Sequence, residues 1–177
     1  IEKLTYSAAN HVWPNSHSLM HFISKNKLCK SAKLNIIAKG STNGIPVNRF
    51  SKESLDEKII NEVKEQIHYS ADQTYLLCIG RLVKDKGIIE LVHVFMQLQK
   101  DNTKLKLILV GEYENTLDPL SAATLLEIEN NASIIHINWS NRVEYFMHLA
   151  HFFVFPSHRE GFPNVLLQAG SMGLPVI

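Results

Sequence analysis

The segment from Gly80 to Gly87 includes Arg81 and Lys86, which can bind a phosphate, and glycines that let the chain turn closely around it. Arg81 can donate two parallel hydrogen bonds to phosphate oxygens, and Lys86 supplies a point charge. An apolar run precedes this loop and a helical pattern follows, so the amides and the dipole of a helix would point at the same place. A solvated basic turn would contain the same residues. Neither a Walker A motif nor GxGxxG is present, so P-loop hydrolysis and the usual dinucleotide site have no support.

A second polar loop, residues 156–164, is also expected to follow a strand and precede a helix. Its Glu160 and the later Gln168 can accept hydrogen bonds from hydroxyl groups, and the amides of residues 161–165 could face an anion. One carboxylate beside several N–H donors suits a polyol that carries a phosphate. The alternative is that Glu160 only stabilises a helix N-terminus through its charge.

Apolar runs that alternate with helical patterns predict the framework for both loops. Short buried runs bounded by turn signals indicate parallel strands covered on both faces. The expected strands are Thr74–Ile79, Leu105–Val110, Ser133–Ile137 and Phe152–Phe155, with a fifth starting at Pro175. The predicted fold class is therefore α/β, a parallel-sheet, Rossmann-like sandwich with helices on both faces. Ligands of such sheets bind outside the carboxyl ends of the strands.

Helices are expected between these strands. An apolar stripe predicts one from Gly87 to about Lys100. Asp118-Pro119 is expected to cap a helix that ends near Asn130. Another is expected over Asn141–Leu149, and the last begins at Pro163. Before the first strand, Ser54 to Glu57 reads as a capping box at the start of an amphipathic helix. These elements are expected at residues 54–67, 87–100, 118–130, 141–149 and from 163.

Residues 1–44 have a different pattern and are predicted to be the tail of a first α/β domain. Two strands, Ala9–Asn15 and Leu34–Lys39, would flank a helix capped by Ser16 or Ser18, with Leu19, Phe22 and Ile23 turned inward. The turn-rich stretch 40–46 would connect the domains. Residues 45–177 are then expected to be most of a second α/β domain, incomplete at its C-terminus because the chain stops in an expected core strand.

Composition narrows the class of protein. The chain has 177 residues, 45% hydrophobic and 20% charged, and a formal net charge of +1, which is typical of globular domains. No run approaches the roughly 18 apolar residues of a membrane span, and no signal peptide is evident, so a cytoplasmic protein is expected. Cys29 and Cys78 lack metal or disulfide spacing. His17 and His21 have helical metal-ligand spacing, but no Cys or carboxylate cluster is expected beside them, so we expect no metal.

The charge is concentrated at the N-terminus. Residues 1–40 contain six Lys and one Glu, a net charge of +5. Such a segment could make peripheral contact with the inner face of a membrane or bind substrate phosphates, and a solvated helix face is the alternative. Nucleic acid is not expected as a partner, because the segment has few aromatic residues and no Arg to stack on bases.

Together the two loops resemble the retaining family 4 glycosyltransferases, also called glycosyl transferases group 1, which have the two-domain GT-B fold. The resemblance includes Asn43-Gly44-Ile45, Arg49-Phe50, Gly80-Arg81-Leu82 with Lys86-Gly87, and Leu109-Val110-Gly111. Its most specific block runs from Glu160 to Ile177. It covers nearly the whole chain apart from an N-terminal stretch without a clear motif. The resemblance implies that residues 45–177 are a truncated C-terminal donor-binding domain, which binds the nucleotide sugar, and that residues 1–44 are the tail of an N-terminal, acceptor-side domain.

The resemblance implies a role for each matching residue. Arg81 and Lys86 match the basic pair that neutralises the donor diphosphate while the glycosidic bond breaks. Glu160 matches the first carboxylate of the family's E-x7-E motif, which contacts hydroxyls of the donor sugar. Gln168 stands at the second position, where the family usually has Glu on the ribose. The implied catalytic residues are Arg81, Lys86 and Glu160, and the implied donor-binding residues are Gly80, Gly161, Phe162, Pro163, Asn164, Val165 and Gln168. Residues 138–142 correspond to the base-binding region.

The expected function is the transfer, with retention, of a hexose or N-acetylhexosamine from a nucleoside diphosphate sugar, most plausibly UDP-linked. The acceptor would be a growing polysaccharide or a lipid-linked glycan, as in capsule or lipopolysaccharide synthesis, and no cofactor or divalent metal is implied. This chain alone is expected to be inactive, because acceptor binding falls mainly in the first domain. The alternatives are a non-catalytic nucleotide-sugar-binding or partner module, or a related GT-B epimerase or phosphorylase.

Overall fold

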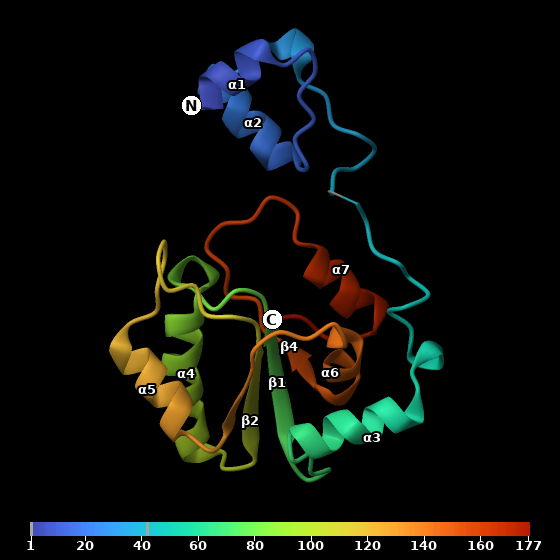
Figure 1. Cartoon of the computed structure of the whole chain (residues 1–177), viewed down its shortest axis with the longest axis vertical. Helices are drawn as coiled ribbons and strands as arrows, with labels where there is room; N and C mark the ends of the chain where they lie inside the picture. Colours follow the sequence, from blue (N-terminus) through green and yellow to red (C-terminus); the bar gives the residue numbers. More distant parts are fainter. Residues whose placement is uncertain (1, 42) are drawn as a thin grey trace. The chain divides into compact units, whose positions relative to one another are not determined.

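Two runs of aliphatic residues form the centre of a parallel sheet in the computed structural model, which describes residues 2–41 and 43–177 (Figure 1). The sheet has the order β3-β2-β1-β4. Its strands are β1 (Thr74–Ile79), β2 (Leu105–Val110), β3 (Ile134–Ile137) and β4 (Phe152–Phe153). Thr74 pairs with Leu105 and Leu107 pairs with Ile134, so β1, β2 and β3 end at the same side of the sheet. The predicted α/β fold class is confirmed.

Helices cover both faces of this sheet (Figure 1). They are α3 (Glu57–Gln66), α4 (Ile88–Asp101), α5 (Ala122–Asn130), α6 (Val143–Leu149) and α7 (Asn164–Ser171). Helix α4 packs on β2 and α5 on β3, whereas α6 packs on β1 and also contacts α3. In a parallel sheet both faces need such cover, because the crossover helices must bury the apolar side chains of the strands.

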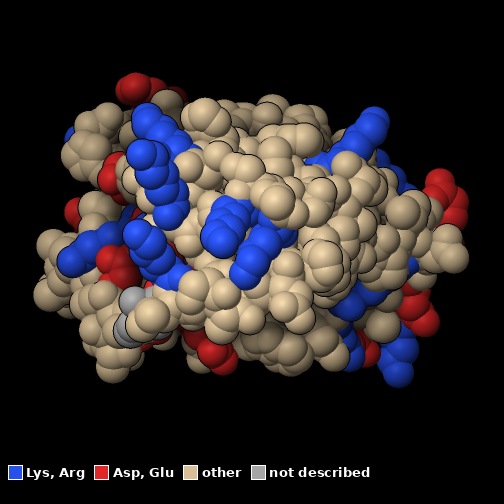
Figure 2. Space-filling view, turned by 90° about the horizontal axis from the view of Figure 1, so that it is seen from above, with Lys and Arg blue, Asp and Glu red and all other residues tan. Residues whose placement is uncertain are grey.

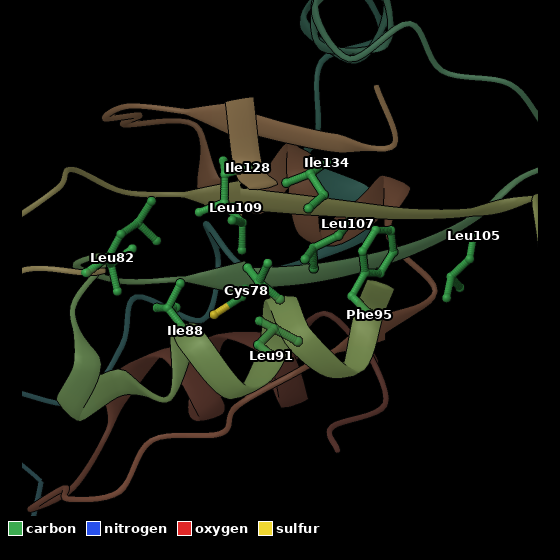
Figure 3. Close-up of a cluster of buried hydrophobic side chains, with 12 residues drawn as sticks. Cys78, Leu82, Ile88, Leu91, Phe95, Leu105, Leu107, Leu109, Ile128 and Ile134 are labelled. Carbon is green, nitrogen blue, oxygen red and sulfur yellow. The ribbon is translucent and has the colours of Figure 1, made fainter. Parts of the chain in front are cut away.

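The core between α4 and the sheet is continuous and tightly filled (Figure 3). Ile88, Leu91 and Phe95 form the apolar stripe of α4 and meet Leu107 and Leu109 of β2. All five are buried. Each such side chain contributes about 1.5–3 kcal/mol when it leaves water, so this cluster fixes the strands whose ends carry the loops of interest.

The chain divides into two compact units. One comprises residues 1–45 with 160–164, and the other comprises residues 46–159 with 165–177. The first unit contains α1 (Glu2–Ala8) and α2 (His17–Lys25). Thr42, in the expected turn-rich stretch, lies outside the described residues. The assignment of residues 1–44 and 45–177 to an acceptor-side and a donor-side domain stays a prediction.

Several local predictions for residues 1–44 are wrong. The expected strands at 9–15 and 34–39 are reduced to one bridge between Val12 and Leu34. Ser16 does cap α2, because its hydroxyl accepts from the Leu19 amide at 3.1 Å. Of the three apolar residues expected to point inward, only Ile23 is buried, whereas Leu19 and Phe22 are 36% and 54% exposed. The amphipathic pattern was right about the helix and wrong about its buried face.

Two predicted helix caps are also wrong. Helix α3 is capped by Asp56, whose carboxylate accepts from the Lys58 amide at 2.7 Å, and not by a box that starts at Ser54. Helix α5 is capped by Ser121 and not by Asp118. The segment from Pro175, where a fifth strand is expected to start, does pair in parallel with β4: Val176 bridges to Phe153, the Phe153 amide donates to the Pro175 carbonyl at 2.7 Å, and the Ile177 amide donates to the Phe153 carbonyl at 2.9 Å. Strand β4 is two residues shorter than predicted.

Candidate functional site

The floor of the candidate site is backbone from two neighbouring strand ends. The segments that follow β1 and β2 stay paired through their backbones. The Gly80 amide donates to the Val110 carbonyl at 3.0 Å, and the Leu82 amide donates to the Glu112 carbonyl at 2.9 Å. A β-carbon on Gly111 would lie 1.8 Å from the Gly80 carbonyl oxygen. Only glycine permits this approach. The two turns therefore expose main chain, which small ligands can approach closely.

A groove of about 240 Å³ lies over this floor. Its lining comes from the ends of β1 and β2 and from the loop after β3: Ile79, Gly80, Arg81, Val110, Gly111, Glu112, Trp139, Ser140 and Val143. The Trp139 side chain is 69% exposed. An exposed indole beside a backbone-lined floor can stack on a planar ring such as a nucleobase. Asn138 to Arg142, the segment expected near the base, thus contributes to the groove.

Arg81 lies where this groove meets a wider depression. It lines both hollows, and the second has a volume of about 700 Å³. The side chain of Arg81 is 66% exposed, and its Nη1 lies 4.0 Å from Glu114 Oε2. At that distance in solvent the pair is weak, so the guanidinium keeps N–H donors for an incoming anion.

Glu114 is held in place by its own loop. Its carboxylate accepts hydrogen bonds from the Thr116 hydroxyl at 2.6 Å and from the amides of Thr116 and Leu117 at 3.0 and 3.3 Å. These bonds, with a smaller effect of Arg81, lower the pKa of Glu114. Its negative charge therefore persists beside Arg81 and partly offsets the positive potential there.

Several polar side chains that line the wider depression pair with one another. His158 Nε2 lies 3.0 Å from Glu90 Oε1, and Arg159 Nε lies 3.7 Å from Asp85 Oδ2. The Asp85 amide donates to Asp118 Oδ2 at 2.7 Å. This last bond explains why Asp118 does not cap α5: its carboxylate closes the loop before α4 instead.

Lys86 occupies a different position from Arg81. It is half-buried in a short 3-10 helix, Lys84–Lys86, and among the described residues it belongs to neither lining set. Burial raises the pKa of the Cys78 thiol to about 12, and the charge of Lys86 opposes that rise. The positive charge of Lys86 therefore acts on the buried Cys78 thiol of β1, whereas the Arg81 side chain faces solvent.

The N-terminus of α4 follows directly. Gly87 has a φ of +68°, and a β-carbon there would lie 2.3 Å from the Pro156 carbonyl oxygen. This close approach ties the loop after β4 to the start of α4. The 14 residues of α4 give this N-terminus a helix dipole that favours an anion.

The second predicted loop is divided between the two units. Glu160, Gly161, Phe162, Pro163 and Asn164 group with the first unit, whereas Val165 and Gln168 belong to the second. Within the first unit, the Ser41 hydroxyl donates to Asn164 Oδ1 at 2.9 Å. Gln168 is half-buried on α7.

The sequence of residues 59–177, about two thirds of the chain, matches the family described as glycosyl transferases group 1. The chain belongs to this family. A curated member, the capsular polysaccharide biosynthesis glycosyltransferase CapM of Staphylococcus aureus, is 34% identical over 180 residues, which are all of this chain and 45% of CapM. The chain thus spans just under half the length of that relative.

A second curated relative is a diphospho-undecaprenol N-acetylgalactosaminyltransferase of Campylobacter jejuni, which is 24% identical over 98% of this chain and 42% of that protein. Among solved structures, Anabaena HepE in complex with UDP and glucose has a TM-score of 0.78 at 18% identity, over 99% of this chain and 46% of HepE. WaaG, from lipopolysaccharide biosynthesis, has a TM-score of 0.74 at 18% identity, over 93% and 42%. These structures share the fold of this group 1 chain.

Two further observations describe this group 1 glycosyltransferase chain. Within residues 2–41 and 43–177, no three His, Cys, Asp or Glu side chains gather as metal ligands would. No helix in the same residues has the length and apolar character needed to span a membrane. His17 and His21 are both exposed on α2.

Sequence reasoning missed Glu114 as the carboxylate beside Arg81. A signal was present, because Glu112 and Glu114 follow β2 directly and the ends of adjacent parallel strands meet at one edge. It also gave no role to Arg49, whose side chain reaches the loop after β3. Spacing along the chain could not reveal that contact, because the partners are 92 and 95 residues away.

Proposed function

We propose that this chain is the donor-binding half of a retaining family 4 glycosyltransferase that uses a UDP-linked hexose or N-acetylhexosamine. One observation carries the proposal: the exposed guanidinium of Arg81 stands at the junction of a backbone-floored groove, which holds Trp139, and a wider depression. A nucleoside diphosphate has matching parts, a planar base and a diphosphate. HepE, of the same fold, was solved with UDP and glucose.

The chemistry needs a group that stabilises the departing nucleotide. When the bond between the anomeric carbon and the terminal phosphate oxygen breaks, its electron pair leaves with UDP. A fixed cation beside that oxygen lowers the barrier because the negative charge grows in the transition state. We assign this role to Arg81, with Lys86 adding positive potential and the start of α4 adding its dipole. No cofactor or metal is part of the proposal, so transfer should persist in a chelator.

The roles of the second loop rest on the resemblance. Glu160 would contact hydroxyls of the donor sugar, and the amides of Gly161, Phe162, Pro163, Asn164 and Val165 would lie near the donor phosphate. Gln168 would contact the ribose as a neutral amide. The acceptor would be a polysaccharide or lipid-linked glycan, as the names of CapM and the Campylobacter enzyme suggest for those proteins.

Gln168 also motivates a second candidate, a non-catalytic nucleotide-sugar-binding module. A carboxylate at this position would accept two ribose hydroxyls, whereas an amide accepts with one oxygen only. The two candidates share donor binding and differ in turnover. Replacing Gln168 by Glu should raise the affinity for the donor whether the protein is an enzyme or a binding module. Only an enzyme should form a glycosylated product.

We further propose that the first unit contacts an anionic membrane surface from the cytoplasmic side. Figure 2 shows a group of Lys and Arg side chains on one face of the molecule. In the first unit, a hollow of about 470 Å³ is lined by Lys3, Tyr6, Ser7, Lys27, Leu28, Cys29, Lys30 and Lys33. No acidic residue is among them. Each Lys near an anionic surface contributes about 1 kcal/mol of attraction.

A panel of sugar nucleotides tests the catalytic proposal. With this chain, UDP-sugars should raise the melting temperature, because a ligand that binds only the folded state stabilises it. With the full-length protein, NMR of the product should show the anomeric configuration of the donor retained. Stabilisation by no nucleotide and no sugar nucleotide would refute donor binding. An inverted product would refute retention alone.

A further inference from the structure

Arg49 makes a network of contacts that no part of the proposed chemistry uses. Its Nε donates to Glu144 Oε1 at 3.0 Å and its Nη2 donates to Glu144 Oε2 at 2.8 Å. The same Nη2 also donates to the backbone carbonyl of Asn141. The guanidinium carbon lies 5.4 Å from the centre of the Phe50 ring. One side chain is thus fixed in four ways.

The pairing with Glu144 is well placed to be rigid. Glu144 is 8% exposed and lies in the first turn of α6. Two parallel charge-assisted hydrogen bonds fix the orientation of both planar groups, as lysine could not do. The carboxylate raises the pKa of Arg49, mainly through this hydrogen bond. Arg49 therefore stays charged and holds one geometry.

The loop that Arg49 holds is part of the groove. Residues 138–142 join β3 to α6, and Trp139 and Ser140 line the groove with Gly80 and Gly111. Arg49 binds this loop through a hydrogen bond to the Asn141 carbonyl, two residues after Trp139. At its end, Arg142 Nη1 lies 2.7 Å from Glu62 Oε2, but both side chains are nearly half exposed. The two arginine side chains are similarly exposed, 43% for Arg49 and 46% for Arg142, but the carboxylate partner of Arg49 is buried and that of Arg142 is exposed.

We propose that Arg49 is a positioning residue that fixes Trp139 for contact with the nucleobase. This inference rests on the proposed function, because it assigns the base to the groove. It predicts that the base-dependent part of nucleotide affinity depends on Arg49, whereas the phosphate-dependent part depends on Arg81. The affinity for a ligand without a base should therefore not change when Arg49 is replaced.

The test compares UDP with inorganic pyrophosphate by titration calorimetry on the 177-residue chain. Arg49→Gln should weaken UDP binding about ten-fold, within the range expected for one stacked base, and leave pyrophosphate binding unchanged. Arg49→Lys should behave nearly as poorly, because the charge is kept and the fork is lost. Arg142→Gln is the matched control, since it removes an arginine from the exposed pair, and it should change UDP binding less than two-fold.

A double variant separates positioning from general damage. Trp139→Ala should weaken UDP binding to a similar degree, and adding Arg49→Gln to it should cost little more, because both changes remove one interaction. Equal loss of UDP and pyrophosphate affinity in Arg49→Gln would overturn the inference, as would additive losses in the double variant. Pyrophosphate also reports the folded fraction of each variant. If the wild-type protein binds pyrophosphate but not UDP, the inference about Arg49 is refuted. If it binds neither ligand, the proposed function is refuted as well.

Discussion

The carbonyl oxygen of Gly80 occupies the space that a β-carbon on residue 111 would need. The separation would be 1.8 Å, and Gly111 has a φ of +154°. Two strand ends meet here with no side chain between them. The floor of the groove beside Arg81 therefore depends on glycine at position 111, whereas a β-carbon on Gly80 would meet nothing within 4 Å.

Gly111→Ala should therefore destabilise the chain by about 1–3 kcal/mol, because the contact is with backbone and one strand end must move. Urea denaturation measures the change. Gly170→Ala is the matched control. It lies in α7, where a β-carbon meets nothing within 4 Å, so it should stabilise by up to about 1 kcal/mol. Equal effects of the two substitutions would contradict the described approach of Gly80 and Gly111.

Cys78 predicts a loss of stability at high pH. Burial raises the pKa of its thiol to about 12 from an ordinary value of 9. Above pH 9 the unfolded thiol loses its proton while the folded one keeps it, so folding stability falls as the pH rises towards 12. The slope from this group approaches about 1.4 kcal/mol per pH unit. Unfolding free energies of wild type and Cys78→Ala should therefore converge between pH 9 and 11.

If the unfolding free energies of wild type and Cys78→Ala do not converge, the Cys78 thiol ionises in the folded state as readily as in the unfolded state. Its reactivity gives an independent check. Native protein should react quickly with a thiol reagent at Cys29, which is half-buried, and slowly at Cys78, which is 5% exposed. Cys29→Ser should remove the fast reaction.

The lysine-lined hollow predicts selective membrane binding. Replacing Lys27 and Lys30 by Gln should weaken binding to vesicles that contain an anionic lipid by about 25-fold, at about 1 kcal/mol for each Lys. Lys33 is left in place because its ammonium group donates to the carbonyls of Ser7 and Ala9 at 3.0 and 2.7 Å. Cosedimentation with vesicles is the measurement.

The control for this prediction removes the same charge elsewhere. Lys25 and Lys39 also belong to the basic N-terminal segment but do not line the hollow. Their double Gln variant should bind vesicles within a few-fold of wild type. If both double variants lose binding equally, net charge and not the hollow determines it.

The central fold could be predicted because its signals are local and redundant. β1 and β2 were predicted to the residue, since each is a short apolar run that must be buried on both faces. Residues 1–44 were predicted poorly. There, Leu19 and Phe22 have the spacing of a buried stripe and yet are exposed, so the pattern alone could not identify what they pack against.

The candidate site was predictable in its position and not in its pairings. Arg81 follows β1, so its place at the sheet edge came from topology. Asp118 looked like a helix cap, but its carboxylate accepts from Asp85. Whether a carboxylate accepts from a nearby amide or from a distant one depends on how the loops pack against one another. The same holds for Arg49 and Glu144, which are 95 residues apart.

The most direct test of the account is the thermal protection of this chain by UDP and its dependence on Arg81. UDP at about 100 times its dissociation constant should stabilise wild type by about 2.7 kcal/mol. Arg81→Ala should remove most of this protection, whereas Lys100→Ala, the same loss of charge on the exposed end of α4, should keep it. Protection that survives in Arg81→Ala, or that disappears equally in Lys100→Ala, would contradict the assignment of the diphosphate to Arg81.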